Sequence, residues 1–151
     1  MNDVSPGIAA MFIRRARETD AAAVAELNDQ LGYPAVVDDV RERLTAIGKL
    51  SSQAVFVACL CEEVMGWIDV ALTFHLQSQP FALIGGLVVK DRYRGMGLGR
   101  RLCEAAEGWA REQGVAVMRV TSRSSRADAH RFYLRDGYRE VKISRVFEKE
   151  L

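Results

Sequence analysis

The fold is decided by one stretch, residues 88–101, which reads Val88-Val89-Lys90-Asp91-Arg92-Tyr93-Arg94-Gly95-Met96-Gly97-Leu98-Gly99-Arg100-Arg101. The pattern predicts the end of a strand, a basic turn with three glycines at alternate positions, and then a helix. Between Arg92 and Arg101 there is no Ser, Thr, Asp or Asn that could cap the first N–H groups of this helix. Glycines leave those groups uncovered, and the arginines add positive charge at the positive end of the helix dipole. The turn is therefore predicted to bind a phosphate or pyrophosphate.

The glycine spacing excludes two common nucleotide-binding turns. A P-loop ends in Gly-Lys-Ser or Gly-Lys-Thr, whereas Gly99 is followed by Arg100 and Arg101. The dinucleotide fingerprint places its third glycine three residues after the second, and Arg100 stands at that position. A glycine-rich turn that binds nothing is the plainer alternative.

Six residues of the turn, Arg94-Gly95-Met96-Gly97-Leu98-Gly99, match the pattern Arg/Gln-x-x-Gly-x-Gly/Ala. The chain therefore resembles the GNAT superfamily of N-acetyltransferases, in element order as well as in this motif, from about residue 12 to the C-terminus. The resemblance implies one GNAT-like acyl-CoA N-acyltransferase domain over residues 1–151. It implies an α/β (α+β) fold with a mixed, mostly antiparallel sheet flanked by helices.

The resemblance also implies that acetyl-CoA is the cosubstrate. The turn then holds the pyrophosphate by its backbone amides, the preceding strand pairs with the pantetheine arm, and the amide of Val88 or Val89 polarises the thioester carbonyl. The residues to which the resemblance assigns cofactor binding are Leu87, Val88, Val89, Arg94, Gly95, Met96, Gly97, Leu98, Gly99, Arg100 and Arg126.

A second motif, Arg126-Ala127-Asp128-Ala129-His130-Arg131-Phe132-Tyr133, is similar to another recurring helix of the family. The resemblance makes Tyr133 the catalytic acid that assists the departing sulfur. A tyrosine hydroxyl, with an ordinary pKa of about 10, stays protonated at neutral pH and can stabilise a thiolate. The plainer interpretation places Tyr133 in the core, and we expect Phe132 to be a core residue. Arg126 stands where the family often has asparagine, and His130 is either a site residue or a partly exposed helix residue.

The general base is not identified by the sequence. Many family members carry a glutamate on the strand before the glycine turn, but the matching residues 82–87 include no carboxylate. Asp69, His75 or a water held by backbone carbonyls could replace it. Within the same stretch, Gly85-Gly86 indicates a bulge or the close approach of another backbone.

The rest of the chain predicts an alternation of helices and strands. The expected strands are residues 12–16, 54–60, 64–74, 81–89 and 115–121, with a hairpin turn at Glu62-Glu63 and one or two further strands in residues 138–148. The first expected helix begins at Thr19 or Asp20 and ends at Gly32, and the second begins at Asp38 or Asp39 and ends near Gly48. The third runs from Leu98 to Gly114. The fourth begins at a capping box of Ser125 and Asp128 and ends at Gly137.

Composition sets the broad class. The 151 residues are 49% hydrophobic and 27% charged, as in an ordinary globular domain. The net charge of +1 gives no electrostatic case for a nucleic-acid or membrane-surface protein. We see no signal peptide, no membrane span and no metal site, and the odd set Cys59, Cys61 and Cys103 does not form a disulfide framework. These features predict a reduced, cytoplasmic protein.

Charge is unevenly distributed along the chain. Residues 18–63 hold nine acids and three bases, a balance of −6, whereas residues 90–101 and 119–135 each have a balance of +4. The acidic segment is either a solvated helix face or a surface that attracts a cationic amine. We therefore expect an N-acetyltransferase that acts by direct transfer on a small cationic amine, with a homodimer as its possible assembly. Acetylation of protein N-termini or lysines, or a non-catalytic acyl-CoA sensor, are the alternatives.

Two further stretches narrow the resemblance. The turn Leu31-Gly32-Tyr33-Pro34 and the C-terminal residues Phe147-Glu148-Lys149-Glu150-Leu151 look like the branch that contains aminoglycoside 6′-N-acetyltransferase-like proteins. This likeness is looser than the likeness to the superfamily.

Overall fold

The computed structural model of the chain describes residues 10–151, which form two compact units divided after Val120. The elements of the first unit are β1 (Met11–Arg15), α1 (Ala21–Leu31), α2 (Val37–Gly48), β2 (Gln53–Leu60), β3 (Glu63–Thr73), β4 (Phe81–Val89), α3 (Leu98–Glu112) and β5 (Met118–Val120), with 3₁₀ turns at Glu18–Asp20 and Asp91–Tyr93. The second unit holds α4 (Ala127–Arg135). No helix in the described part of the chain is long and apolar enough to cross a bilayer.

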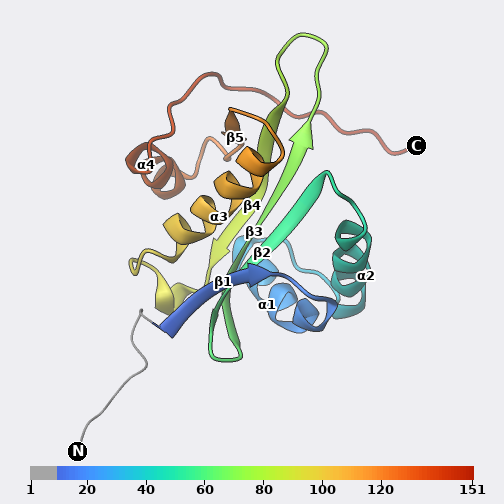
Figure 1. The fold of residues 1–151 in the computed structure, drawn as a ribbon, viewed down its shortest axis with the longest axis vertical. Helices are drawn as coiled ribbons and strands as arrows, with labels where there is room; N and C mark the ends of the chain where they lie inside the picture. The colour runs from blue at the N-terminus through green and yellow to red at the C-terminus, as the bar shows by residue number, and fades with distance from the viewer. Residues whose placement is uncertain (1–9) are drawn as a thin grey trace, which may run out of the picture. The chain divides into compact units, whose positions relative to one another are not determined.

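The first unit is built on one sheet with the strand order β1-β2-β3-β4-β5 (Figure 1). The first three pairs are antiparallel, and β4 and β5 are parallel. This arrangement confirms the mixed, mostly antiparallel sheet. The β4–β5 ladder spans only Ala82–Ile84 of β4 in the described structure. Residues 85–89 of β4 therefore extend beyond their parallel neighbour.

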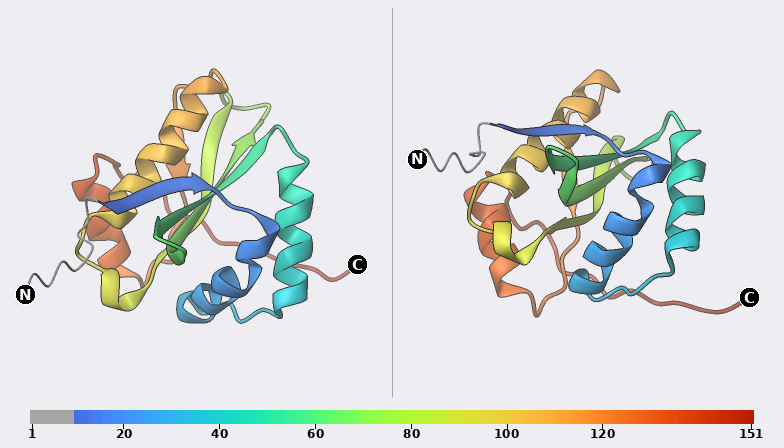
Figure 2. Two further views of the ribbon diagram at one scale, coloured as in Figure 1. Left: turned by 60° about the horizontal axis from the view of Figure 1, so that its bottom comes forward. Right: turned by 90° about the horizontal axis from the view of Figure 1, so that it is seen from below.

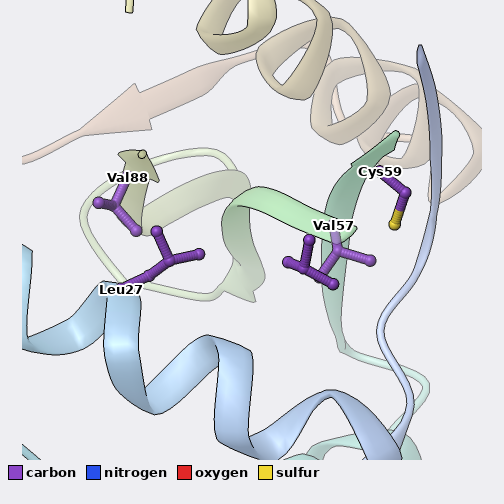
Figure 3. Close-up of a cluster of buried hydrophobic side chains, with 5 residues drawn as sticks. Leu27, Val57, Cys59 and Val88 are labelled. Atoms are coloured by element: carbon purple, nitrogen blue, oxygen red, sulfur yellow. The ribbon is translucent and has the colours of Figure 1, made fainter. Parts of the chain in front are cut away.

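Helices cover both faces of this sheet (Figure 2). α1 packs on β3 and β4 and α2 packs on β2, whereas α3 covers the opposite face across β2, β3 and β4. Between α1 and the sheet, Leu27 lies among Val57, Cys59 and Val88 (Figure 3). α3 begins at Leu98 as predicted and is buried along one face, because its apolar residues recur at helical spacing. The buried residues of α3 are Leu98, Leu102, Cys103, Ala106, Trp109 and Ala110.

The first two helices begin within two residues of the predicted starts, but neither has a side-chain capping bond. Asp20 directly precedes α1, but its side chain makes no capping bond. Its carboxylate instead accepts hydrogen bonds from the Arg14 guanidinium (both 2.8 Å) and from the Arg17 amide (2.7 Å). A buried carboxylate needs such partners, so the ion pair takes the oxygens that a cap would use. α2 starts at Val37, which places Asp38 and Asp39 inside its first turn, where acidic side chains favour the helix dipole.

The bounds of β1, β2 and β3 differ from the prediction by one residue, and the bounds of β5 differ by more. The β2–β3 hairpin turns at Cys61-Glu62 rather than at Glu62-Glu63, and Glu63 is already paired with Leu60. Cys61 adopts a left-handed backbone conformation (φ 53°) at the exposed tip of the hairpin. The expected strand over residues 115–121 is reduced to Met118–Val120, the residues that form the ladder with β4, and beyond them the Val117 carbonyl accepts from the Ala82 amide (2.9 Å).

In the second unit, α4 begins at Ala127 rather than at a Ser125 capping box. Its N-cap residue, Arg126, makes no side-chain capping bond, and Asp128 instead pairs with Arg131 one turn later. The expected ending at Gly137 (φ 92°) is confirmed. Phe132 is half-buried rather than a core residue.

The strands expected in residues 138–148 do not form in the described structure. The apolar residues that suggested them, among them Val141, Ile143 and Phe147, are exposed. Alternating hydrophobicity alone does not make a strand, because a strand needs a neighbour to satisfy its backbone groups.

Candidate active site

The glycine turn leads into α3 without a side-chain cap, as the sequence predicts. Gly97 is the N-cap residue (φ 83°), and Gly95 also has a positive φ (77°). A Cβ atom built on either glycine would meet no atom within 4 Å, so the space in front of this backbone is open. An open, uncapped N-terminus on a helix of 15 residues fits a phosphate group. The turn of this chain therefore suits the pyrophosphate of acetyl-CoA.

Two of the basic side chains around the turn bind to the sheet. Lys90 and Arg92 both pair with Glu63 on β3, and the Tyr93 hydroxyl donates to the same carboxylate (2.9 Å). The Arg92 hydrogen bond is the main reason that the pKa of Glu63 lies below its ordinary value. These contacts anchor the 3₁₀ turn to the sheet.

The other bases lie nearer to the start of α3. Arg94 and Arg100 are exposed and pair with Asp91 (3.2 Å) and Glu104 (3.4 Å). Exposed pairs of this kind contribute little, about 0–1 kcal/mol, so a phosphate can replace the carboxylates as a partner.

The backbone of β4 separates the candidate amide donors. The Lys90 amide donates to the Met65 carbonyl on β3 (2.7 Å). Because N–H groups alternate along a strand, the Val88 amide also faces β3, whereas the Leu87 and Val89 amides face the opposite edge. That edge has no ladder to β5 beyond Ile84 in the part of the chain that the structure describes. Leu87 and Val89 therefore fit an acyl group that approaches this edge, and Val88 does not.

Gln30 connects α1 to the start of the glycine turn, and sequence reasoning missed it. Its side-chain amide donates to the Val89 carbonyl (2.7 Å), and its carbonyl accepts from the Asp91 amide (2.9 Å). Since Val89 and Asp91 lie 59 and 61 residues away, no local pattern could reveal the contact. The two bonds fix the position of β4 and the turn relative to α1.

We expect Gln30→Met to loosen this connection while keeping the length of the side chain. The loss of two hydrogen bonds should cost about 1–3 kcal/mol of unfolding free energy and weaken acetyl-CoA binding several-fold. Urea denaturation and titration calorimetry measure the two effects. Gln113→Met is the matched control, since Gln113 is exposed at the end of α3. Equal behaviour of the two variants would contradict the role of Gln30.

The glycine pair of β4 forms the predicted bulge. Asp69 pairs with Gly86 and Val70 with Ile84, so Gly85 is the extra residue. A Cβ atom on Gly85 would lie 2.8 Å from Asp69 Oδ1, and one on Gly86 would lie 2.6 Å from the Trp67 ring. The close approach is therefore made by side chains of β3 and not by another backbone. The two glycines leave room for a carboxylate and an indole.

The candidates for the base occupy different places. Asp69 lines a cavity between β3 and the helices α1 and α2, next to the stretch of β4 that lacks a carboxylate. His75 follows β3, is exposed, and packs its ring edge-on against Phe81 at the first residue of β4 (5.3 Å between centroids). The structure brings Asp69, and not His75, to the glycine pair.

The residues predicted from the second motif lie in the second unit. Tyr133 is half-buried and packs edge-on against the rings of Phe132 (5.2 Å) and Tyr138 (5.8 Å). His130 is half-buried, and its Nε2 atom lies 2.9 Å from the Arg123 carbonyl, which favours the interpretation as a helix residue. Arg126 is the N-cap residue of α4.

Comparison with known proteins agrees with this geometry. The model of the Acetyltransferase (GNAT) family matches residues 19–138. The chain is 33% identical over 134 residues to the aminoglycoside N(6′)-acetyltransferase type 1 of Stenotrophomonas maltophilia, a match that covers 85% of this chain and 86% of that protein. It is 39% identical over 79 residues to the aminoalkylphosphonate N-acetyltransferase of Salmonella typhimurium, which covers 52% of this chain and 51% of that one.

A solved structure extends the likeness to the fold. The aminoglycoside N-acetyltransferase AAC(6′)-Iy, in complex with CoA, superposes with a TM-score of 0.83 at 19% identity. The superposition covers 93% of this chain and 95% of that one. It confirms the fold class predicted from the sequence.

Proposed function

The chain belongs to the acetyltransferase (GNAT) family, and we propose that it transfers the acetyl group of acetyl-CoA to a primary amine on a small cationic molecule. The observation that carries the proposal is the open, uncapped N-terminus of α3 behind Gly95 and Gly97. Residues 94–100 would hold the pyrophosphate there, and the exposed edge of β4 would bind the pantetheine arm. Arg126 of α4 is proposed as a further phosphate contact.

The proposed reaction is direct transfer. Acetyl-CoA supplies a thioester whose acyl carbon can accept an amine. The amides of Leu87 and Val89 would stabilise the negative charge that develops on the thioester oxygen, because they face the free edge of β4. Tyr133 would donate a hydrogen bond or a proton to the departing sulfur.

The acidic character of residues 18–63 supports a cationic acceptor. This segment, with its balance of −6, contains α1 and α2, and both helices line the cavity beside Asp69. The two relatives named above act, according to their names, on aminoglycosides and aminoalkylphosphonates. Both classes carry an amine, and the aminoglycosides are polycations.

We expect a polycationic amine to be preferred over neutral and acidic amines in a panel scored by release of free CoA. For the cation, kcat/KM should fall as salt rises from 0.1 M to 1 M, because the Debye length shrinks from about 10 Å to about 3 Å. A neutral amine is the internal control and should show no such fall. A best substrate that is anionic, or rates independent of salt, would show that the acidic segment is only a solvated face.

The same panel separates the alternatives. Lysine-containing peptides that surpass every small amine would indicate a protein acetyltransferase. Binding of acetyl-CoA without release of CoA for any amine would indicate a sensor.

We also propose a homodimer and a cytoplasmic location. The second unit exposes large apolar side chains, among them Ile143, Val146 and Phe147, and exposed apolar groups of this kind favour association. Cys59, Cys61 and Cys103, all among the described residues, are thiols and not disulfides, as expected in a reducing compartment. Light scattering coupled to size exclusion measures the assembly, and a mass of 16.8 kDa would show a monomer.

A further inference from the structure

A cavity of about 110 Å³ lies between α1, α2 and the strands β2 and β3. Three of its lining residues carry polar atoms that are buried and have no hydrogen-bond partner among residues 10–151: Asn28 Oδ1, Trp67 Nε1 and Asp69 Oδ1. An unpaired buried polar atom costs about 1–3 kcal/mol, so native proteins rarely contain several in one place. Three around one cavity require a polar occupant that supplies the missing partners.

The chemistry of these atoms defines the ligand. The oxygens of Asp69 and Asn28 accept hydrogen bonds, and the carboxylate attracts positive charge, so they suit the three N–H donors of a primary ammonium. Trp67 Nε1 only donates, so it needs an acceptor such as a hydroxyl or ether oxygen. A primary amine with an oxygen close to the nitrogen meets the needs of all three atoms.

The size of the cavity limits what enters it. A volume of about 110 Å³ is less than the roughly 150 Å³ that accommodates a benzene ring. Only the amine end of a substrate fits, and the rest of the molecule stays outside. Arg43 is the cation among the lining residues, at the exposed side of the cavity.

The position of Asp69 relative to β4 suits a base. Asp69 pairs with Gly86, and the next residue of β4 is Leu87, whose amide faces the free edge of the strand. Asp69 lies on β3 and the Leu87 amide points away from it, so the carboxylate and this amide stand on either side of β4, one strand spacing of about 4.8 Å apart in the sheet. Because Gly85 and Gly86 have no side chains, the carboxylate of Asp69 on β3 packs against β4, which has no acid of its own in residues 82–87.

We propose that this cavity binds the acceptor through its primary ammonium and that Asp69 takes a proton from it, replacing the carboxylate that β4 lacks. The proposal rests on the acetyl transfer proposed above. Asp69 removes one proton from the ammonium, and the freed lone pair of nitrogen forms the C–N bond at the acyl carbon. The C–S bond breaks and its electron pair leaves on sulfur. The sulfur takes the proton of the Tyr133 hydroxyl proposed above, the second nitrogen proton restores that hydroxyl, and Asp69 releases its proton to water.

Protonation of Asp69 follows from its surroundings. Burial, the strongest influence, raises the pKa of this carboxyl, and the nearby amides of Gly86 and Gly85 lower it by less. The other residues that face it from α1, α2 and β2 are uncharged apart from Arg43. A carboxyl with a raised pKa accepts a proton more readily, so kcat should rise with pH as Asp69 ionises.

The first test compares Asp69→Asn with Glu112→Gln, which neutralises an exposed carboxylate at the end of α3, outside the acidic segment 18–63. Asp69→Asn should fold, keep the thermal shift caused by acetyl-CoA, and lose about 10²–10⁴-fold in kcat. Its deficit should shrink at high pH, where the free amine loses its proton in water, and a purely structural defect would not show this recovery. Glu112→Gln should behave as wild type.

The second test addresses the oxygen contact. Trp67→Phe keeps an aromatic ring and removes only the N–H donor. Wild type should have a higher kcat/KM for a 2-hydroxyalkylamine than for the matching alkylamine. In Trp67→Phe the ratio of these two kcat/KM values should fall about tenfold, while the affinity for acetyl-CoA stays unchanged. This measurement stands even if Asp69→Asn does not fold.

The outcomes separate the two proposals. Absence of CoA release by wild type for every amine would overturn the proposed function. If wild type turns over and the kcat of Asp69→Asn lies within twofold of the wild-type value, the role of Asp69 is overturned. A deficit in kcat that does not depend on pH would overturn it as well. An unchanged preference in Trp67→Phe would overturn the oxygen contact.

Discussion

Replacement of Gly97 by valine should abolish the stabilisation of this protein by acetyl-CoA. A ligand at 100 times its Kd adds about 2.7 kcal/mol to the free energy of unfolding, which is a shift of several degrees in Tm. The valine side chain would fill the open space in front of the α3 N-terminus, where no protein atom lies within 4 Å of a Cβ at this position. The loss would therefore come from exclusion of the ligand and not from a clash within the protein.

The other end of the same helix offers a matched control. Gly114 has the same φ as Gly97, 83°, and equally open surroundings. Valine should strain the backbone similarly at both positions, by about 1–2 kcal/mol or more for a β-branched residue. Thermal shift assays with and without acetyl-CoA should show a lower Tm for both variants and a lost response only for Gly97→Val. A retained response in Gly97→Val would remove the cofactor site from this turn.

Tyr133→Phe should lower kcat by about 10²–10⁴-fold, the usual range for a positioned acid. The variant keeps the ring that packs between Phe132 and Tyr138, so its Tm and its affinity for acetyl-CoA should remain those of wild type. Steady-state kinetics with the best amine of the panel measures the effect.

Tyr138→Phe serves as the control, because it removes a hydroxyl from a neighbouring ring of the same unit. Its kcat should stay close to that of wild type. If Tyr133→Phe also stays within a factor of two, the hydroxyl has no part in the reaction and Tyr133 serves only in packing.

Local signals explain which features the sequence could predict. The glycine turn and α3 are encoded within residues 88–114, where the strand, the missing cap and the apolar spacing of Leu98, Leu102 and Trp109 follow each other directly. The bulge at Gly85-Gly86 was likewise visible, since glycine within a strand often marks a bulge or a close approach.

Features that depend on distant partners could not be predicted in the same way. Nothing near Gln30 indicates its contact with β4, and nothing near Asp69 indicates that it lies opposite the glycine pair. Both depend on strand register and on how α1 packs, which are properties of the whole sheet. Asp20 shows the same limit, because the pairing with Arg14 overrides its local preference for a cap.

The hairpin tip between β2 and β3 makes this protein convenient for spectroscopy. Cys61 is exposed there, whereas Cys59 and Cys103 are buried, so a thiol-reactive fluorophore should label one position without any mutagenesis. Two residues later, Glu63 bonds to Arg92 and Tyr93 at the entrance of the glycine turn. A dye on Cys61 therefore lies on the segment that anchors this turn, and its emission offers an optical titration of cofactor binding that requires no knowledge of the amine.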